Sequence, residues 1–238
     1  MSIAENIKRV EKNIEDALMR SGRKPGETKL IAVSKTKPVE DMLSAYSEGV
    51  RDFGENYVQE IVQKYDNIPS DARLHMIGHL QTNKVKKVVG RVAMIHSVDS
   101  IHLAEAISRE SLKQGITTDV LLEVNIADEA TKYGFTRAEA MAVVPEIMEL
   151  SGVALRGLMT SAPITEDPET NRTYFKAMRE LLSEMRELMR QRGTAEEKLP
   201  TELSMGMTGD YIVAVEEGAT MVRVGTAIFG ARDYSSRA

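Results

Sequence analysis

Residues 30–34 read LIAVS, a short apolar run of the kind that forms a buried strand. The segment before this run follows a different period. Apolar residues recur at helical spacing from Ile3 to Leu18, and Ser2 and Glu5 form a capping box at the start of that segment. The same change from a helical period to a short strand-like run recurs along the chain, and this repetition decides the predicted fold.

Eight strand-like runs alternate with amphipathic stretches. The predicted strands are residues 30–34, 50–53, 74–77, 94–97, 120–125, 154–159, 202–204 and 221–224. The predicted helices between them include residues 39–48, 55–65, 101–113, 137–150 and 171–192. This alternation indicates a parallel sheet, and eight units within 238 residues favour a closed barrel over an open doubly wound sheet. We therefore predict an α/β fold, a single TIM-type (β/α)8 barrel domain spanning residues 1–238.

The composition argues against several classes of protein. A net charge of -5 lacks the basic excess of proteins that bind nucleic acids or lipid surfaces. The chain has no cysteine, which excludes disulfides and thiolate metal sites and favours a reducing compartment. The N-terminal sequence has no signal-peptide pattern, and no apolar run is long enough to cross a bilayer. We expect a cytoplasmic protein with neither a membrane nor a nucleic-acid partner.

Functional residues of such a barrel lie at the C-terminal ends of its strands, and the first strand is followed by Lys35. Lys35 shares strand parity with Ile31 and Val33, so it points into the barrel mouth if those two point inward. A lysine amine in that position could attack an aldehyde. The alternative is an ordinary solvated lysine at a strand end.

Glycine-rich segments follow the seventh and eighth predicted strands. The first contains Ser204 and Gly206, and the second contains Gly225 and Thr226. These two loops commonly form the phosphate site of a barrel. Neither segment matches a Walker or Rossmann pattern, and glycines after strands are often plain turns, so only their place in the fold supports the interpretation.

Other polar residues have two interpretations each. Asn56, after the second strand, could contact a ligand ring or its hydroxyl, or it could cap the following helix. Glu123 in the fifth strand should lie inside the barrel and need a partner, for which Arg156 is a candidate. His75 could lie near a ligand or be a core histidine with satisfied hydrogen bonds. The four histidines show no metal-binding spacing, so we expect no metal site.

Six segments, taken in order, carry a family resemblance. They are AVSKTKP at 32–38, FGENYVQE at 53–60, HMIGHLQTNK at 75–84, GLMT at 157–160, LSMGMTGD at 203–210 and VRVGTAIFG at 222–230. Together they resemble the pyridoxal phosphate homeostasis protein family over almost the whole chain. The resemblance implies that the cofactor is pyridoxal 5'-phosphate (PLP). It also implies a PLP fold type III barrel like the N-terminal domain of alanine racemase, without the second β-domain of that enzyme.

The resemblance also implies roles for individual residues. Lys35 would carry PLP as a Schiff base, and Arg223 would face the pyridine nitrogen. Lys132, in TKYG, matches a further lysine that the family carries near the site. The residues that would bind the phosphate are Ser204, Gly206, Gly225 and Thr226.

The leading functional hypothesis is a PLP carrier that acts in PLP homeostasis, buffering the free cofactor and handing it to PLP-dependent apoenzymes rather than catalysing a reaction. The alternative is a PLP-dependent amino-acid racemase, which needs a second base from an extra domain of a partner subunit. The 238 residues leave no room for that domain after the eighth unit, so we expect at most weak racemase activity and a monomer. A third possibility is a phosphosugar-binding barrel in which Lys35 is incidental.

Overall fold

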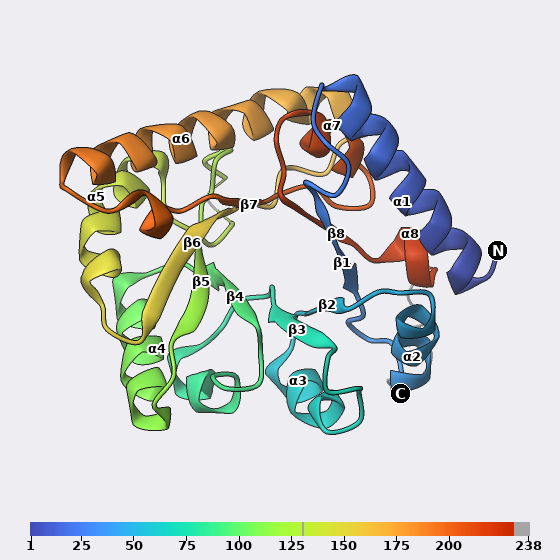
Figure 1. Cartoon of the computed structure of the whole chain (residues 1–238), viewed down its shortest axis with the longest axis horizontal. Coiled ribbons are helices and arrows are strands. Elements are labelled where there is room, and N and C mark those ends of the chain that lie inside the picture. The colour runs from blue at the N-terminus through green and yellow to red at the C-terminus, as the bar shows by residue number, and fades with distance from the viewer. Residues whose placement is uncertain (130, 231–238) are drawn as a thin grey trace.

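A closed barrel of eight parallel strands forms the centre of the computed structural model, which describes residues 1–129 and 131–230 (Figure 1). The strands pair in chain order, and β1 closes the barrel against β8. They are β1 (Lys29–Val33), β2 (Asp52–Glu55), β3 (Arg73–Met76), β4 (Met94–Val98), β5 (Thr118–Glu123), β6 (Val153–Met159), β7 (Glu202–Ser204) and β8 (Met221–Val224). The predicted α/β barrel is confirmed.

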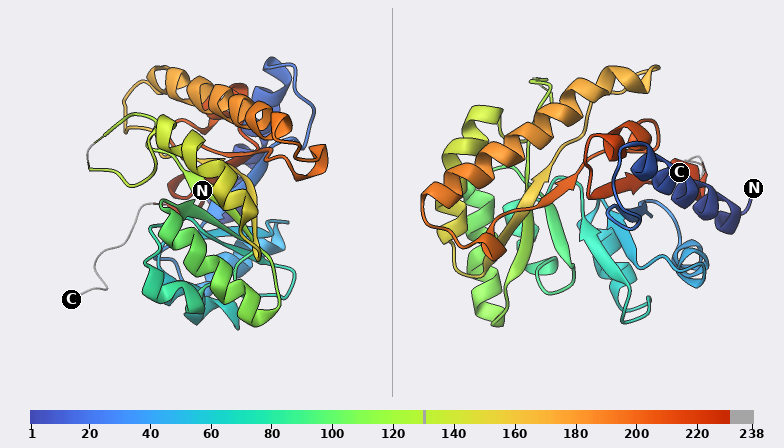
Figure 2. Two further views of the ribbon diagram at one scale, coloured as in Figure 1. Left: turned by 90° about the vertical axis from the view of Figure 1, so that its left-hand side faces the viewer. Right: turned by 45° about the horizontal axis from the view of Figure 1, so that its top comes forward.

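Helices cover the outside of the barrel (Figures 1 and 2). They are α1 (Ile3–Arg20), α2 (Val39–Ser47), α3 (Val58–Tyr65), α4 (Ile101–Gln114), α5 (Arg137–Glu149), α6 (Arg172–Gln191), α7 (Tyr211–Glu216) and α8 (Thr226–Phe229), with 3-10 helices η1 (Thr82–Lys87), η2 (Pro168–Asn171) and η3 (Glu196–Lys198). Helix α1 lies against α7 and α8, and α6 packs against β6 and β7. Within the described part of the chain, every helix is too short or too polar to span a bilayer.

Helix α1 shows how the sequence pattern becomes structure. The Ser2 N–H donates to Glu5 Oε2 at 2.7 Å, and the Glu5 N–H donates to Ser2 Oγ at 3.2 Å, which completes the predicted capping box. The apolar stripe is buried against the rest of the protein at Ile7, Val10 and Leu18. Burial of this stripe fixes α1 beside the last two helices.

The second strand lies further along the chain than predicted. Strand β2 continues to Glu55, which pairs with Met76 of β3, and the Ile77 N–H donates to Glu55 O at 2.9 Å. Helix α3 therefore begins at Val58 rather than at residue 55. The ladder to β3 determines this boundary, which the local sequence pattern did not reveal.

The strands separate two layers of side chains. The outer layer, between strands and helices, is mostly apolar and contains large buried residues such as Phe53 and Phe175. The inner layer fills the barrel and includes an apolar cluster of Ile31, Met94, Leu121, Met159 and Met221. It also contains a row of buried polar residues, Asp52, His75, His96, Ser204 and Arg223. The barrel interior is thus partly polar, whereas the outer layer is mostly apolar, with a few buried polar side chains such as Lys64 and Ser111.

Strand β5 confirms one part of a prediction and corrects another. Leu122 and Val124 belong to the outer layer and Leu121 to the inner one, so Glu123 shares its strand face with the inner layer, as expected. Arg156 is not its partner, because Arg156 Nε donates to Asp119 Oδ1 at 2.9 Å. The register between β5 and β6 shifts by one residue here, which leaves Arg156 without a position in the ladder and exposed to solvent.

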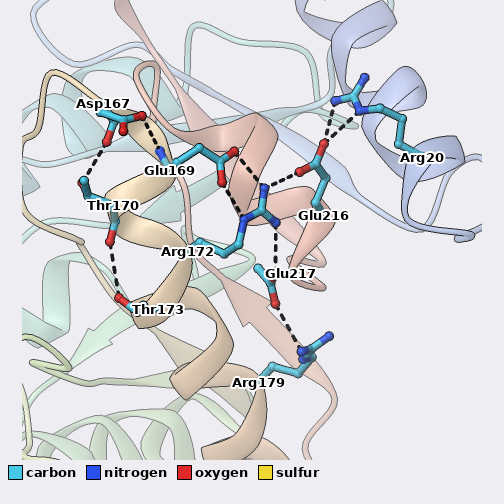
Figure 3. A network of polar contacts seen from close by, with 9 residues as sticks. All are labelled: Arg20, Asp167, Glu169, Thr170, Arg172, Thr173, Arg179, Glu216 and Glu217. Carbon is cyan, nitrogen blue, oxygen red and sulfur yellow. Dashed lines mark hydrogen bonds and ion pairs between the residues drawn. The ribbon is translucent and has the colours of Figure 1, made fainter.

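A surface network of ion pairs ties α6 to α1 and α7 (Figure 3). The Arg172 guanidinium donates to both oxygens of Glu169, at 2.7 and 2.8 Å. It also donates to Glu216 at 2.7 Å and to Glu217 at 3.0 Å. Glu216 accepts a further hydrogen bond from Arg20 Nε at 2.9 Å. Arg172 thus connects α6 to the end of α7, and Glu216 extends the network to α1.

Candidate functional site

A cavity of about 280 Å³ lies at the C-terminal ends of the strands. Five of the predicted site residues line it: Lys35, Asn56, Arg223, Gly225 and Thr226. The others that line it are Val33, Ile77, Ser161, Met207, Thr208 and Gly209. The cavity therefore combines one amine, one guanidinium, several hydroxyl groups and an amide.

Lys35 reaches the cavity for the reason that its strand parity predicts. Ile31 belongs to the inner apolar cluster, and Val33 and Lys35 both line the cavity. Side chains two residues apart on a strand share a face, so β1 directs all three into the barrel. Lys35 is half-buried at the rim of the interior.

A cluster of charged and polar residues fixes the backbone on both sides of Lys35. Ser34 Oγ donates to Glu55 Oε1 at 2.6 Å, and Ser34 O accepts from Lys64 Nζ at 2.9 Å. Thr36, whose φ of 65° lies in the left-handed region, donates its N–H to Glu60 Oε2 at 2.8 Å. Lys64 Nζ also donates to Glu55 at 2.8 Å and to Glu60 at 2.7 Å. Burial raises the pKa of Glu55, and Lys64 opposes that rise.

Asn56 does not cap a helix, because Tyr57 is the residue that precedes α3. Asn56 is instead one of the residues that line the cavity. Its Oδ1 is buried and has no hydrogen-bond partner among the described residues. A buried acceptor of this kind normally has a partner, so Asn56 marks a position where a ligand would supply a donor.

Arg223 is a buried cation in the cavity wall, only 4% exposed. Its Nη1 donates to Ser204 O and Ser204 Oγ, both at 2.7 Å, and its Nη2 donates to Thr160 O at 2.8 Å. Burial lowers the pKa of Arg223 to about 10, against the attraction of Glu123 and Asp210. The group therefore stays charged at neutral pH.

Ser204 and Gly206 lie close to the site, but the lining formed by residues 1–129 and 131–230 does not include them. Ser204 is fully buried, and its Oγ lies 2.7 Å from Arg223 Nη1 and 2.9 Å from His96 Nδ1. Gly206 has a φ of 90°, and a Cβ there would lie 2.5 Å from the Ala214 Cβ. Ser204 thus holds the Arg223 side chain by a hydrogen bond. At position 206 the backbone packs so closely against α7 that a side chain would clash with Ala214.

Three further lining residues were given no role from the sequence. Thr208 and Gly209 come from the loop after β7, and Ser161 comes from the segment after β6. All three follow strands, so the rule that function lies at the C-terminal ends could have found them. Of the predicted residues, Ser204 ends β7 and Gly206 lies in the same loop as Thr208 and Gly209, but neither is among the described residues that line the cavity.

The loop after β8 brings Gly225 and Thr226 to the cavity. A Cβ at position 225 would lie 3.2 Å from Val33 O, so a side chain there would crowd β1. Thr226 begins α8, and the next N–H, of Ala227, donates to Thr208 Oγ1 at 3.5 Å. The two predicted phosphate loops therefore meet at one wall of the cavity.

His75 is an interior histidine with satisfied hydrogen bonds. Its Nε2 lies 2.8 Å from Asp52 Oδ1 and its Nδ1 lies 3.0 Å from His96 Nε2. His96 was not predicted as an interior residue, although its parity with Met94 on β4 was a usable signal. Histidines of two neighbouring strands therefore contact each other inside the barrel.

Lys132 lies beside the cavity. Its Nζ donates to Glu129 Oε1 at 2.6 Å and to Ser161 O at 3.1 Å. Ser161 lines the cavity, so its backbone carbonyl holds the Lys132 amine next to the site.

Comparison with known proteins identifies the family. The chain matches the family described as alanine racemase, N-terminal domain, over residues 6–233. A pyridoxal phosphate homeostasis protein of Aquifex aeolicus (strain VF5) is 43% identical over 235 residues, covering 98% of this chain and 100% of that protein. The chain belongs to the pyridoxal phosphate homeostasis protein family.

Solved structures place this family member within a larger group of barrels. The structure of PipY from Synechococcus elongatus PCC7942 with PLP bound is 36% identical, with a TM-score of 0.81, and covers 96% of this chain and 100% of that one. An alanine racemase of Clostridium difficile 630 gives a TM-score of 0.72 at 15% identity, covering 95% of this chain but 57% of that one. The second likeness shows the fold alone, a barrel that corresponds to part of alanine racemase.

Proposed function

We propose that this protein binds PLP as a Schiff base on Lys35 and acts in PLP homeostasis as a buffer and carrier of the cofactor. The observation that carries the proposal is the cavity itself. An amine from Lys35, the guanidinium of Arg223 and the hydroxyl of Thr226 line one cavity of about 280 Å³. Its volume is near the lower end of ligand pockets, about 300 Å³, as suits a small cofactor.

The residues present fit the functional groups of PLP. Lys35 supplies the amine that its aldehyde requires. The buried Oδ1 of Asn56, which has no partner in the described part of the chain, fits the ring hydroxyl as a donor. Arg223 supplies donors for the ring nitrogen, and the loops containing Thr208 and Thr226 supply hydroxyl and N–H groups for the phosphate.

The support for homeostasis comes from the family and from Arg223. The Aquifex aeolicus relative is named a pyridoxal phosphate homeostasis protein. PLP, when bound, supplies an electron sink that is strong only if its ring nitrogen is protonated. Arginine has donors but no acceptor, so a guanidinium at that nitrogen occupies the lone pair and opposes protonation. We therefore expect storage of the cofactor with negligible amino-acid turnover.

The attachment site is tested by borohydride reduction of the protein after incubation with PLP, followed by peptide mass spectrometry. The phosphopyridoxyl group should appear on the peptide that contains Lys35. Lys35→Ala should abolish this labelling, whereas the control Lys37→Ala, two residues away, should keep it. Labelling mainly on Lys132 or on a surface lysine would refute the assignment.

The carrier role is tested by transfer. The PLP-loaded protein should reactivate a PLP-dependent apoenzyme in the presence of a phosphatase that destroys an equal amount of free PLP. If the phosphatase destroys the PLP of the loaded protein as fast as it destroys free PLP, the buffering role is contradicted. Robust racemisation of an amino acid by the pure protein, absent in Lys35→Ala, would instead favour a racemase.

A further inference from the structure

A row of hydrogen bonds crosses the barrel interior from Asp52 on β2 to Arg223 on β8. His75 Nε2 lies 2.8 Å from Asp52 Oδ1, and His75 Nδ1 lies 3.0 Å from His96 Nε2. His96 Nδ1 lies 2.9 Å from Ser204 Oγ, which lies 2.7 Å from Arg223 Nη1. All five residues are at most 4% exposed. We call this row the inner relay.

The two ends of the inner relay determine its direction. Asp52 accepts from Arg73 Nε at 2.8 Å, and Lys29 Nζ lies 3.9 Å from its carboxylate. Burial opposes ionisation of Asp52, but hydrogen bonds from Arg73 and His75 outweigh it and hold the pKa of Asp52 well below its usual range. Asp52 therefore only accepts. At the other end, Arg223 only donates.

Each group between these ends then has one possible role. His75 must donate from Nε2 to Asp52, which leaves its Nδ1 to accept from His96 Nε2–H when the ring is neutral. His96 Nδ1 then accepts from the Ser204 hydroxyl, and Ser204 Oγ accepts from Arg223. Each of the four hydrogen bonds along the relay then has one donor and one acceptor.

The reverse direction requires a proton on both nitrogens of His75. Burial lowers the pKa of His75, and Lys29 and Arg73 lower it further, against the attraction of Asp52. Burial also lowers the pKa of His96, with His75 and Arg223 adding to that effect. The arrangement with two neutral rings is therefore the favoured one.

We propose that the inner relay holds His75 and His96 as neutral Nε2–H tautomers and makes Asp52, His75 and His96 positioning residues for the Arg223 guanidinium. This rests on the proposed function in one respect, namely that Arg223 meets the ring nitrogen of PLP. When the Ser204 hydroxyl donates its hydrogen bond to His96, its oxygen can only accept from Arg223. This hydrogen bond fixes the position of Arg223 Nη1. With Nη2 held by Thr160 O at 2.8 Å, the plane of the guanidinium is set before any ligand binds.

The tautomers are tested on the full-length protein without PLP, labelled with 15N-histidine. Two-bond 1H–15N spectra at pH 7 should show a protonated Nε2 and an unprotonated Nδ1 for both His75 and His96. The exposed His79 and His102 are assigned by His79→Gln and His102→Gln. A doubly protonated His75, or a proton on Nδ1 of His96, would overturn the proposal whether or not the protein binds PLP.

The positioning role is tested with Asp52→Asn, which replaces the acceptor-only carboxylate at the end far from the cavity by an amide that can also donate, so that the direction of the relay is no longer fixed. The matched control is Asp119→Asn, which removes the same charge from another barrel strand, where Asp119 accepts from Arg156 at 2.9 Å. Asp52→Asn should disturb both tautomers, shift the absorption band of bound PLP and raise its Kd by about twofold to tenfold, the range for one hydrogen bond. Asp119→Asn should change none of these.

Unchanged tautomers and an unchanged Kd in Asp52→Asn would overturn the positioning role. If Asp52→Asn does not fold, Ser204→Ala provides a second test, because it cuts the relay next to Arg223. It should shift the absorption band of bound PLP in the same way. An unshifted band in Ser204→Ala would equally overturn the positioning role. If the unsubstituted protein shows both predicted tautomers but does not bind PLP, the proposed function fails while the relay stands.

Discussion

Two layers of side chains lie on opposite faces of the same eight strands, and they differ in chemistry. The outer layer is a mostly apolar core in which strand residues such as Phe53 and helix residues such as Phe175 are buried. The inner layer combines a small apolar cluster with the buried polar row that ends at Arg223. Apolar packing tolerates many partners, whereas a buried polar group needs a specific one. We therefore expect outer-layer substitutions to affect stability and inner-layer substitutions to affect the site.

Removal of an outer-layer ring should have the largest effect. Phe175 on α6 is fully buried, and Phe175→Ala should lower the free energy of unfolding by about 3–5 kcal/mol because it leaves a cavity. Urea denaturation measures this, and PLP affinity of the folded fraction should be unchanged. The exposed neighbour Lys176 provides the control, with Lys176→Ala expected within about 0.5 kcal/mol of the parent. A loss below about 1 kcal/mol in Phe175→Ala would contradict the assignment of this layer as the main stabilising core.

A change at the cavity should show the opposite pattern. Thr226 is exposed at the cavity and belongs to neither layer. If Thr226 binds the phosphate as proposed, Thr226→Val removes one hydroxyl donor, worth about 1.5–3 kcal/mol. The Kd for PLP should then rise by roughly tenfold or more with little change in stability. Equilibrium titration followed by absorbance measures the Kd. Equal weakening of pyridoxal, which lacks the phosphate, would show that Thr226 does not act on that group.

The inner layer should also make stability depend on pH. Burial raises the pKa of Glu123 to about 7, Asp99 adds to the rise and Arg223 opposes it. The folded protein therefore holds this proton more tightly than the unfolded chain, and stability is lost as the pH rises from about 4.5 to about 7. Glu123→Gln removes this loss, so its stability relative to the parent should be about 1–3 kcal/mol greater at pH 8 than at pH 4. Urea titrations without PLP measure the free energy of unfolding of both proteins. A difference between Glu123→Gln and the parent that does not change with pH would be evidence against the raised pKa.

Outside both layers, the surface network should contribute least. Arg172 lies on the surface, where water screens its pairs with Glu169, Glu216 and Glu217 (Figure 3). Arg172→Ala should lower the free energy of unfolding by about 1 kcal/mol at low salt. This loss should be smaller at about 1 M salt, where the Debye length is about 3 Å. Thermal unfolding at the two salt concentrations tests this. A larger, salt-independent loss would show that the network behaves like a buried core.

The same contrast explains what the sequence could predict. The outer layer follows from local periodicity, which is why Leu122 and Val124 were placed correctly. Lys35 and Thr226 were found because strand ends define the mouth of a barrel. Ser204 was expected among the phosphate ligands, but its contacts come from Arg223 and His96, the latter 108 residues away. No local pattern carries such information.

Register changes are a second kind of information that local patterns lack. Arg156 was expected beside Glu123, but the register between β5 and β6 shifts by one residue and Arg156 pairs with Asp119 instead. The end of β2 at Glu55 depends in the same way on pairing with β3. Elements were therefore predictable from periodicity, whereas individual polar partners were not.

The fixed backbone around Lys35 has a consequence for the speed of ligand exchange. Ser34 and Thr36 are already held by Glu55 and Glu60, so this segment has little conformational entropy left to lose when a ligand arrives. Association should then be limited by diffusion into the cavity and by bond formation at the amine, without a slow loop-ordering phase. We therefore expect repeated uptake and release of a small molecule to leave this backbone segment unchanged.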